Sequence, residues 1–383
     1  MRYVYFDNAT TSYPKPPLIT DEVAHFLSDG GCSPGRSGHT YGRRSEERIE
    51  QARNVVARFF GVTNGTAITY TYNATYGLNM VIKGFLKQGD HVVTTCMEHN
   101  SVLRPLEMLQ KEGRITYTVV GLDADGRLAM DDLRQSLADG VRLVVVNHAS
   151  NVTGQINDIG LITTEAHAHG AKVLVDCSQT AGHVPIDLTA LDVDFAVFTG
   201  HKALLGLPGV GGVYIKDFRD VGTIIEGGTG NNSMSILHPA LPPHKFEAGT
   251  VNYTGIIALG AGIAQLTQTG FDDIRTMEIA LIERLETALR SMDSIRIIGN
   301  TRSAERTPVL SFCIDDVPAN IAAARLDADY GIMTRPGIQC APLMHKALST
   351  SPTGTVRLSL DYRNTTDECD YLAESLRDMM KKQ

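Results

Sequence analysis

Short runs of apolar residues alternate with longer stretches of helical periodicity through the first two-thirds of the chain. The apolar runs are rich in β-branched side chains, which is typical of strands that are buried on both faces of a sheet. Strands are predicted at residues 66–72, 91–96, 114–120, 142–150, 171–178, 194–200 and 211–216. Helices are predicted between several of them, at residues 74–86, 101–113 and 161–170. This alternation predicts an α/β fold with a mostly parallel sheet that helices cover on both faces.

The pattern changes after a glycine-rich helical stretch that begins at Ile256. Further helices are predicted at residues 272–292, 320–331 and 366–382, and strands at residues 308–314 and 355–360. These elements favour a smaller α+β domain at the C-terminal end. We therefore predict an N-terminal segment (1–16) that packs with the small domain, a large domain (17–262) and a small C-terminal domain (263–383) that carries a loop around Cys340.

Composition and charge narrow the class of protein. The 383 residues suffice for two domains, and a net charge of −8 without any lysine/arginine tract argues against a nucleic-acid partner. We predict no signal peptide, because no basic segment followed by an apolar one opens the sequence, and no membrane partner, because the longest apolar stretch, at residues 255–264, is too short to span a bilayer. Six scattered cysteines without a CxxC pair suit a reducing compartment. We expect a cytoplasmic protein.

Polar residues follow several of the predicted strands, at the edge of an open α/β sheet where ligands gather. Asp176 ends one strand, and His201 and Lys202 follow the next. A lysine in such a place is usually a solvated loop residue, and an aspartate is usually a structural hydrogen-bond acceptor. His99 and Asn151 lie beyond two further strands, and their presence favours a binding site.

The turn at Asn73, Ala74 and Thr75, between a predicted strand and a helix, offers a place for an anion. Free backbone N–H groups and the dipole at a helix N-terminus attract phosphate. A lysine, a carboxylate, a histidine and such a helix start meet the needs of pyridoxal phosphate. The lysine amine forms an imine with the aldehyde, and the carboxylate keeps the pyridine nitrogen protonated so that the ring accepts electrons.

The segment TGHKALLGLPGVGGVYI (199–215) resembles the cofactor-lysine segment of class V aminotransferases, and within them of cysteine desulfurases and selenocysteine lyases. The other segments that match are FDNATTSYP, RSGHTYGRR, TYNATYGLN, EHNSV, ASNVTGQIND, DCSQTAGHVPIDL, FEAGTVNYTGI, RPGIQCAPLMH and RLSLDYRNT. The resemblance runs from residue 6 to residue 365, nearly the whole chain. It implies the fold of type I pyridoxal phosphate-dependent transferases, with a seven-stranded, mostly parallel sheet in a large cofactor-binding domain.

The resemblance also implies roles around the cofactor. Lys202 would bind it covalently, Asp176 would pair with the pyridinium, and His99 would stack on the ring and act as an acid/base. Gln179 and Asn151 would reach the phenolic oxygen. The residues that would hold the phosphate are Ala74, Thr75, Thr199 and His201, joined by Gly249 and Thr250 from a partner subunit. A homodimer with shared sites follows from that last pair.

The substrate would be held by arginine. By the same resemblance, Arg357, in a plausible edge strand, would bind the substrate carboxylate as a planar two-pronged donor, with Asn151 and Arg335 beside it. No metal site is expected, because His167 and His169 are two residues apart and do not share a helix face.

Cys340 selects the reaction. Gly337 and Pro342 bracket it, which indicates an exposed loop, and nearby Arg335 favours its thiolate form. The short loop resembles the Suf-type branch of the family, although Gln339 stands where that branch usually carries histidine. We therefore predict a cysteine desulfurase that converts L-cysteine to L-alanine, forms a persulfide on Cys340 and passes the sulfur to an acceptor protein or a small thiol.

Other activities on the same scaffold stay open. A selenocysteine lyase or cysteine-sulfinate lyase needs less help from a thiol, and a class V aminotransferase or epimerase would use the same cofactor. A sulfur carrier without turnover is disfavoured, because the catalytic residues named above are all present. A dinucleotide-binding loop at residues 209–212 is also disfavoured, because this glycine-rich stretch precedes a strand instead of joining a strand to a helix.

Overall fold

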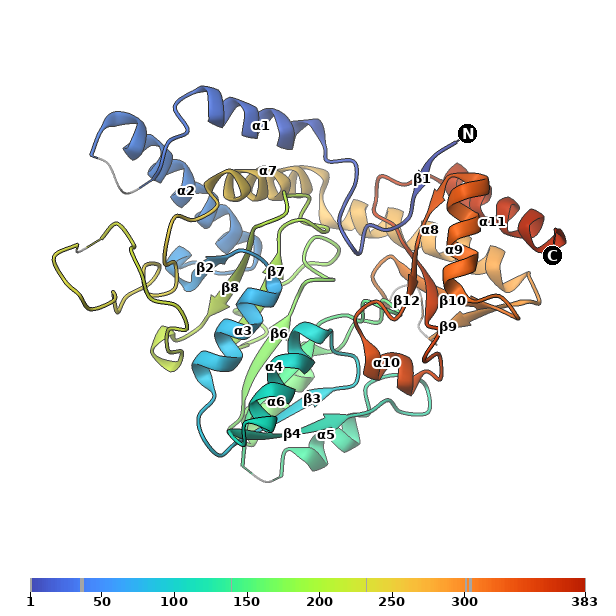
Figure 1. Cartoon of the computed structure of the whole chain (residues 1–383), viewed down its shortest axis with the longest axis horizontal. Helices are drawn as coiled ribbons and strands as arrows, with labels where there is room; N and C mark the ends of the chain where they lie inside the picture. The colour runs from blue at the N-terminus through green and yellow to red at the C-terminus, as the bar shows by residue number, and fades with distance from the viewer. Residues whose placement is uncertain are drawn as a thin grey trace.

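The computed structural model of the chain describes residues 2–34, 38–138, 140–231, 233–299, 302 and 305–382. A large sheet with helices on both sides occupies one end of the molecule, and a smaller sheet with its own helices occupies the other (Figure 1). The N-terminus and the C-terminus both lie at the smaller sheet's end (Figure 1).

The large sheet has seven strands in the order β2-β8-β7-β6-β5-β3-β4. Its strands are β2 (Ile68–Thr71), β3 (Asp90–Thr95), β4 (Ile115–Val120), β5 (Val141–Asn147), β6 (Lys172–Asp176), β7 (Phe195–Thr199) and β8 (Gly211–Ile215). Strands β3 to β7 run parallel, whereas β8 is antiparallel to both of its neighbours. The predicted strands and the mostly parallel sheet are confirmed. Because β5, β6 and β7 are parallel, their carboxyl ends meet at one edge.

Helices cover both faces of this sheet, as predicted. They are α1 (Pro17–Ser28), α2 (Thr40–Phe59), α3 (Ala74–Phe85), α4 (Asn100–Lys111), α5 (Met130–Ser136), α6 (Ile159–Ala168) and α7 (Tyr253–Thr269). Apolar side chains of α3 and α4 fill one face, and those of α1, α2, α6 and α7 fill the other. The short helix α5 is not predicted, because it buries only Leu133 and shows no helical period. Among the described residues, no helix is both long and apolar enough to cross a membrane.

The smaller sheet is antiparallel, with the order β12-β13-β10-β9. Its strands are β9 (Ile295–Ile298), β10 (Val309–Ile314), β12 (Arg335–Gly337) and β13 (Thr355–Ser359), and a separate parallel pair joins β1 (Val4–Tyr5) to β11 (Ile332–Met333). The helices of this part are α8 (Phe271–Arg290), α9 (Ala319–Tyr330), α10 (Pro342–Ala347) and α11 (Thr366–Lys381). Its core takes in Val4 and Phe6 from the start of the chain. The domain boundaries stay a prediction.

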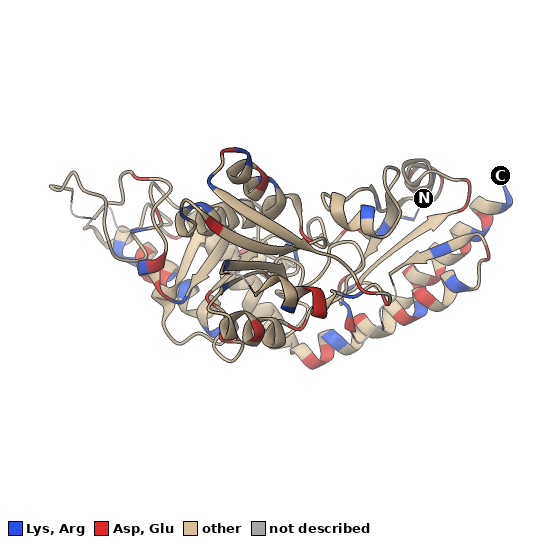
Figure 2. Ribbon diagram, turned by 90° about the horizontal axis from the view of Figure 1, so that it is seen from below, with Lys and Arg blue, Asp and Glu red and all other residues tan. Residues whose placement is uncertain are grey.

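Acidic and basic side chains are interspersed along the outer helices of this part (Figure 2). In α8 and α11 the charged residues alternate with apolar residues that are buried, such as Leu285 and Leu376. The two helices therefore turn one apolar stripe to the small core and one mixed-charge face to water.

A buried ion pair joins α2 to the loop between β8 and α7. The side chain of Arg53 is 2% exposed, and its Nη1 and Nη2 atoms donate to the Glu247 carboxylate at 2.7 and 3.0 Å. The guanidinium lies 4.5 Å from the centre of the Tyr70 ring, and the Tyr70 backbone N–H donates to the same carboxylate at 2.7 Å. The second carboxylate near Arg53 is that of the more exposed Glu50, at 3.1 Å.

Glu247→Gln should lower the free energy of unfolding by about 3 kcal/mol, because it leaves a buried guanidinium with little counter-charge. Urea unfolding followed by circular dichroism measures the difference. Glu305→Gln is the matched control, because its ion pair with Arg127, at 2.6 Å, has side chains 41% and 48% exposed. That control should change stability by about 0.5 kcal/mol or less. Equal losses of unfolding free energy in the two variants would contradict a stabilising role for the buried Arg53–Glu247 pair.

Candidate active site

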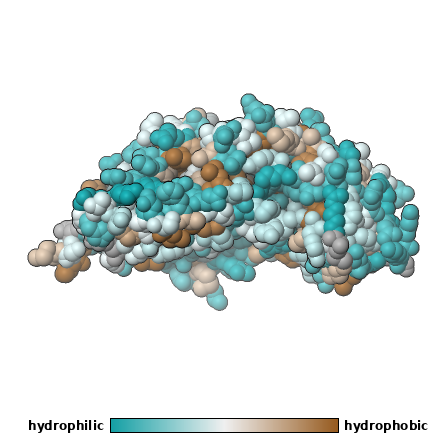
Figure 3. All heavy atoms as spheres, turned by 90° about the horizontal axis from the view of Figure 1, so that it is seen from above, coloured by the Kyte–Doolittle hydropathy of each residue, from teal (hydrophilic) through white to brown (hydrophobic). Residues whose placement is uncertain are grey.

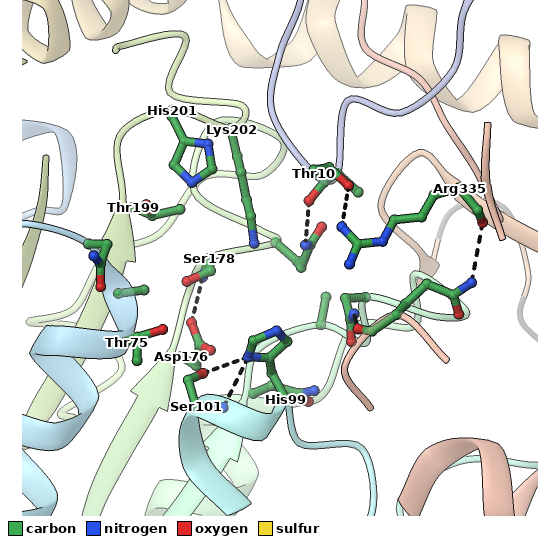
Figure 4. Close-up of a pocket in the computed structure, with 18 of the residues that line it drawn as sticks. Thr10, Thr75, His99, Ser101, Asp176, Ser178, Thr199, His201, Lys202 and Arg335 are labelled. Atoms are coloured by element: carbon green, nitrogen blue, oxygen red, sulfur yellow. Dashed lines mark hydrogen bonds between the residues drawn. The ribbon is translucent and has the colours of Figure 1, made fainter. Parts of the chain in front are cut away.

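A pocket of about 220 Å³ opens at the carboxyl edge of the large sheet, where the smaller sheet approaches it (Figure 4). Most of the predicted site residues line it, namely Ala74, Thr75, His99, Asn151, Asp176, Gln179, Thr199, His201, Lys202, Arg335 and Arg357. The pocket thus gathers residues from strand ends, helix starts and the C-terminal part of the chain.

The ends of the parallel strands and the start of α4 position these side chains. Asp176 and Thr199 are the last residues of the adjacent parallel strands β6 and β7. Lys202 follows in the turn after β7, and His99 is the residue that caps the N-terminus of α4. Parallel strands that end together place such residues around one space.

The start of α3 forms the pocket wall nearest β7. The Asn73 side chain caps the helix by accepting a hydrogen bond from the Tyr76 backbone N–H at 2.9 Å, and Ala74 and Thr75 form the first turn. Thr199 Oγ1 is buried and has no hydrogen-bond partner among the described residues. An unpaired buried hydroxyl costs about 1–3 kcal/mol. The hydroxyl and the helix start together suit a phosphate group.

Lys202 extends into the pocket from the turn after β7 (Figure 4). Burial lowers the pKa of its amine to about 8, with smaller contributions from the nearby guanidinium groups of Arg357 and Arg335, while Asp176 and Cys340 oppose the shift. About one tenth of the amine is therefore uncharged at pH 7, far more than for an ordinary lysine. The uncharged amine is the form that attacks an aldehyde.

His99 lies across the pocket from the start of the Lys202 side chain (Figure 4). Its Nδ1 atom lies 2.8 Å from Ser101 Oγ and accepts a hydrogen bond from the Ser101 backbone N–H at 3.1 Å. Burial, followed by the positive charge of Lys202, lowers the pKa of His99 to about 4. The ring is therefore neutral at physiological pH. Since Nδ1 accepts, the ring carries its proton on Nε2.

Asp176 lies below Lys202 and is 6% exposed. Its Oδ1 atom accepts a hydrogen bond from the Ser178 backbone N–H at 2.9 Å (Figure 4). Ser178 Oγ and Asn151 Oδ1 are buried without hydrogen-bond partners among the described residues. The pocket therefore holds a buried carboxylate and two unpaired polar atoms. This combination suits a heteroaromatic ligand with a protonated ring nitrogen and polar ring substituents.

The side-chain amides of Gln179 and Asn151, both predicted at the site, donate hydrogen bonds to backbone oxygens of the chain. Gln179 Nε2 donates to the Ala9 backbone oxygen at 3.1 Å, and Asn151 Nδ2 donates to the Gln339 backbone oxygen at 2.7 Å. Each NH₂ group keeps a second hydrogen for another acceptor. The amides therefore also tie the pocket to the first residues of the chain and to the cysteine loop.

Cys340 lies beside this pocket and is half-buried, whereas we expected an exposed loop. Its Sγ atom is 3.9 Å from Arg335 Nη2, and Arg335 lines the pocket. The Asn100 backbone N–H, at the start of α4, donates to the Cys340 backbone oxygen at 2.8 Å. The loop therefore fixes the thiol next to a positive charge at the site.

Gln339 anchors this loop, a role that the sequence did not suggest. Gln339 and Cys340 have φ values of +44° and +59°, in the left-handed region that residues other than glycine rarely adopt. Gln339 is 3% exposed, its Nε2 donates to the Thr355 backbone oxygen at 3.1 Å, and its Oε1 lies 2.7 Å from His345 Nε2. These bonds hold the strained backbone that presents the cysteine.

Arg357 is fully buried at the back of the pocket. Its strand β13 lies between β12 and β10, so the expectation of an edge strand is wrong. Its Nη2 atom donates to Asp7 Oδ1 at 2.9 Å and its Nη1 atom to the Asn151 backbone oxygen at 3.1 Å. Its Nε–H is buried without a partner among the described residues, and thus remains for a ligand.

Some predicted residues lie elsewhere. Gly249 and Thr250 line a separate hollow with Arg53 and Glu247, and not the Lys202 pocket. Arg36 and Ser37, which open the RSGHTYGRR segment, lie outside the described residues. The pocket-lining residues that sequence reasoning missed are Ala9, Thr10, Ser101, Asn147, Ala149, Ser178 and Gln339. Ala9 and Thr10 belong to the FDNATTSYP segment, which was the available signal.

Comparison with known proteins finds relatives along nearly the whole chain. The family model of aminotransferase class V matches residues 4–372. A probable cysteine desulfurase of Synechocystis sp. is 33% identical over 98% of this chain and 90% of that protein, and one of Methanothermobacter thermautotrophicus is 33% identical over 98% and 94%. Among solved structures, the apo cysteine desulfurase of Thermococcus onnurineus NA1 matches with a TM-score of 0.91 and 30% identity, covering 100% of this chain and 95% of that one. The Escherichia coli cysteine desulfurase CsdA gives 0.87 and 28%, covering 98% and 94%.

Proposed function

Because the chain belongs to the aminotransferase class V family, we propose that it is a pyridoxal phosphate-dependent cysteine desulfurase, which forms L-alanine and a persulfide on Cys340. One observation carries this proposal. The Cys340 thiol lies 3.9 Å from the guanidinium of Arg335, which lines the same pocket as the amine of Lys202. A thiol beside a positive charge and an amine-bearing pocket is the arrangement that sulfur abstraction from an amino acid needs.

The pocket fits pyridoxal phosphate, the cofactor that this family uses. Lys202 supplies the amine for covalent attachment, and Asp176 supplies a carboxylate for the ring nitrogen. The unpaired Thr199 hydroxyl, the start of α3 and His201 suit the phosphate. When bound, the cofactor would act as an electron sink for the electron pair of the substrate Cα–H bond.

The chain's own residues then divide the remaining work. Arg357 holds the substrate carboxylate through its unpaired Nε–H. Lys202 would hold the cofactor, and its Nζ atom, when free, would take the Cα proton, for which an amine with a pKa near 8 is suited. His99, neutral at physiological pH, covers the ring without adding charge.

Cys340 carries out the sulfur step. Its thiolate Sγ forms a bond to the substrate sulfur while the substrate Cβ–S bond breaks. The electron pair of the broken bond stays on Cβ, which takes up a proton, so that cysteine and the Cys340 thiol become alanine and a Cys340 persulfide. Arg335 Nη2 lies 3.9 Å from Sγ and holds the sulfur atom beside the pocket. The outer sulfur atom then passes to an acceptor protein or a small thiol.

We also propose that two copies of the chain share their sites. Gly249 and Thr250 lie away from the pocket of their own chain, in the loop between β8 and α7. This loop exposes large apolar side chains, those of Ile225, Met234, Ile236, Leu237 and Leu241, and its end forms the brown tip on the left in Figure 3. Exposed apolar patches of this kind mark interfaces. Sedimentation should give a dimer, and a fully active monomer would contradict the shared site.

All six cysteines are free, which supports a reducing, cytoplasmic location. The proposed activity is tested by incubating the purified protein with cysteine, selenocysteine or cysteine sulfinate. Alanine from cysteine, together with the added mass of one sulfur atom on the Cys340 peptide, is the expected result. Alanine from selenocysteine or sulfinate alone would indicate a lyase, and consumption of a keto acid would indicate an aminotransferase.

A further inference from the structure

The hydroxyl of Thr10 lies between the two arginines of the pocket. Arg335 Nη1 donates to Thr10 Oγ1 at 2.7 Å, and Arg357 Nη2 donates to the same oxygen at 2.9 Å (Figure 4 shows the first of these). Thr10 Oγ1 in turn donates to Asp7 Oδ1 at 2.8 Å. A hydroxyl has one hydrogen and two lone pairs, so these three bonds use its full capacity.

The position of Thr10 is set by the backbone around it and not by the arginines. On one side, the Ala9 backbone N–H donates to Ser359 Oγ at 2.9 Å. On the other side, the Ser12 backbone N–H and Thr11 Oγ1 both donate to the His201 backbone oxygen at 3.0 Å. Hydrogen bonds thus fasten the segment to β13 of the smaller sheet and to the turn after β7. The guanidinium groups align on a fixed oxygen.

This oxygen also determines which arginine hydrogens remain for a ligand. Arg357 uses one Nη1–H on Asn151 and both Nη2–H groups on Asp7 and Thr10, which leaves Nε–H and the second Nη1–H. Arg335 uses Nη1 on Thr10, and its Nη2 lies 3.9 Å from Cys340 Sγ. Without the hydroxyl, Arg335 Nη1 would lose its acceptor and Arg357 would keep only its bonds to Asp7 and Asn151, while the two like charges would lose the oxygen that lies between them.

We propose that Thr10 is a positioning residue, whose hydroxyl fixes Arg335 and Arg357 in the orientation that receives the substrate carboxylate. This inference rests on the proposed function, since it assigns the carboxylate-binding geometry of that same site. Thr10 does not touch the reacting atoms and acts through the two guanidinium groups.

Thr10→Val tests the inference, because it keeps the branched shape and removes the hydroxyl. The KM for cysteine should rise about 10- to 100-fold, the loss expected for charge-assisted hydrogen bonds, while kcat changes by about 3-fold or less. Thr10→Ser restores the hydroxyl and should return KM to within about 3-fold of the wild type. Thr20→Val, at an exposed helix position where the hydroxyl donates to the Pro17 backbone oxygen, is the matched control and should leave both constants unchanged.

Two thiols that differ in one group provide a readout without turnover. Calorimetry on the holoenzyme should show weaker binding of 3-mercaptopropionate, which has the carboxylate, by a factor similar to the rise in KM. Binding of cysteamine, which lacks the carboxylate, should stay within about 2-fold. Because Thr10 acts through both arginines, adding Thr10→Val to the double variant Arg335→Met/Arg357→Met should leave the KM of that double variant unchanged.

The possible outcomes separate the two proposals. A wild-type protein that forms no alanine from cysteine overturns the proposed function, whereas the calorimetric arms still decide the role of Thr10. Unchanged 3-mercaptopropionate binding in Thr10→Val overturns the inference. Equally weakened binding of both thiols to Thr10→Val also overturns the inference. So does a Thr10→Val protein that does not fold while Thr10→Ala binds 3-mercaptopropionate as the wild type does. Either result would assign Thr10 a merely structural role.

Discussion

Replacing Cys340 with alanine should lower alanine formation from cysteine by on the order of 10³-fold or more, while the protein keeps its bound pyridoxal phosphate. In the proposed mechanism the Cys340 thiolate is the nucleophile that receives the substrate sulfur, and its Sγ lies 3.9 Å from Arg335 Nη2. Alanine release measured under steady-state conditions, with the visible absorption of the cofactor recorded in parallel, tests the expectation.

Cys313→Ala is the matched control for this variant. Cys313 is also half-buried and free, but it lies in β10, where its Sγ is 3.8 Å from the Gly354 backbone oxygen. Its replacement should leave alanine formation unchanged. The same Cys340 variant should still release alanine from cysteine sulfinate, because that elimination needs less help from a thiol. Full desulfuration by the Cys340 variant would rule out its role as nucleophile.

Lys202→Ala should abolish covalent attachment of the cofactor and should reduce turnover by on the order of 10³-fold or more. In the proposed mechanism Lys202 provides both the amine that binds the aldehyde and the base that takes the Cα proton. Borohydride reduction of the wild type, followed by digestion and mass spectrometry, should place the cofactor label on the Lys202 peptide. The variant should carry no label.

Lys216→Ala provides the comparison. Lys216 follows the end of β8, and its amine pairs with Asp192 at 2.5 Å, in a side chain that is 41% exposed. This variant should keep both the label and the turnover. A borohydride-stable adduct on another lysine of the Lys202 variant would show that the cofactor assignment is wrong.

The large sheet and the centre of the site could be predicted from the sequence, because local signals determine them. Uninterrupted β-branched runs specify buried parallel strands, and parallel strands end at one edge. Asp176, Thr199 and Lys202 therefore come together without any knowledge of the helices between them. The start of α3 follows for the same reason, since it succeeds a strand at that edge.

The walls of the site could not be predicted in this way. Strand β12 has the sequence Arg-Pro-Gly, which carries no strand signal and forms an edge strand only because β13 pairs with it. Gln339 reads as a loop residue, yet contacts with Thr355 and His345 bury it. The hydroxyl of Thr10 accepts hydrogen bonds from two guanidinium groups far along the chain. No local sequence pattern predicts such a contact.

Thr10 and the two arginines that donate to it lie far apart along the chain, and this separation has a consequence for biosynthesis. The hydrogen bonds from Arg335 and Arg357 to Thr10 close loops of 325 and 347 residues. During translation, the strands of the large sheet emerge and can pack early, whereas Thr10 meets its partners only after β13 has left the ribosome. A chain that ends between residues 203 and 334 therefore carries Lys202 but neither arginine, and under the proposed mechanism it lacks the groups that bind the substrate carboxylate.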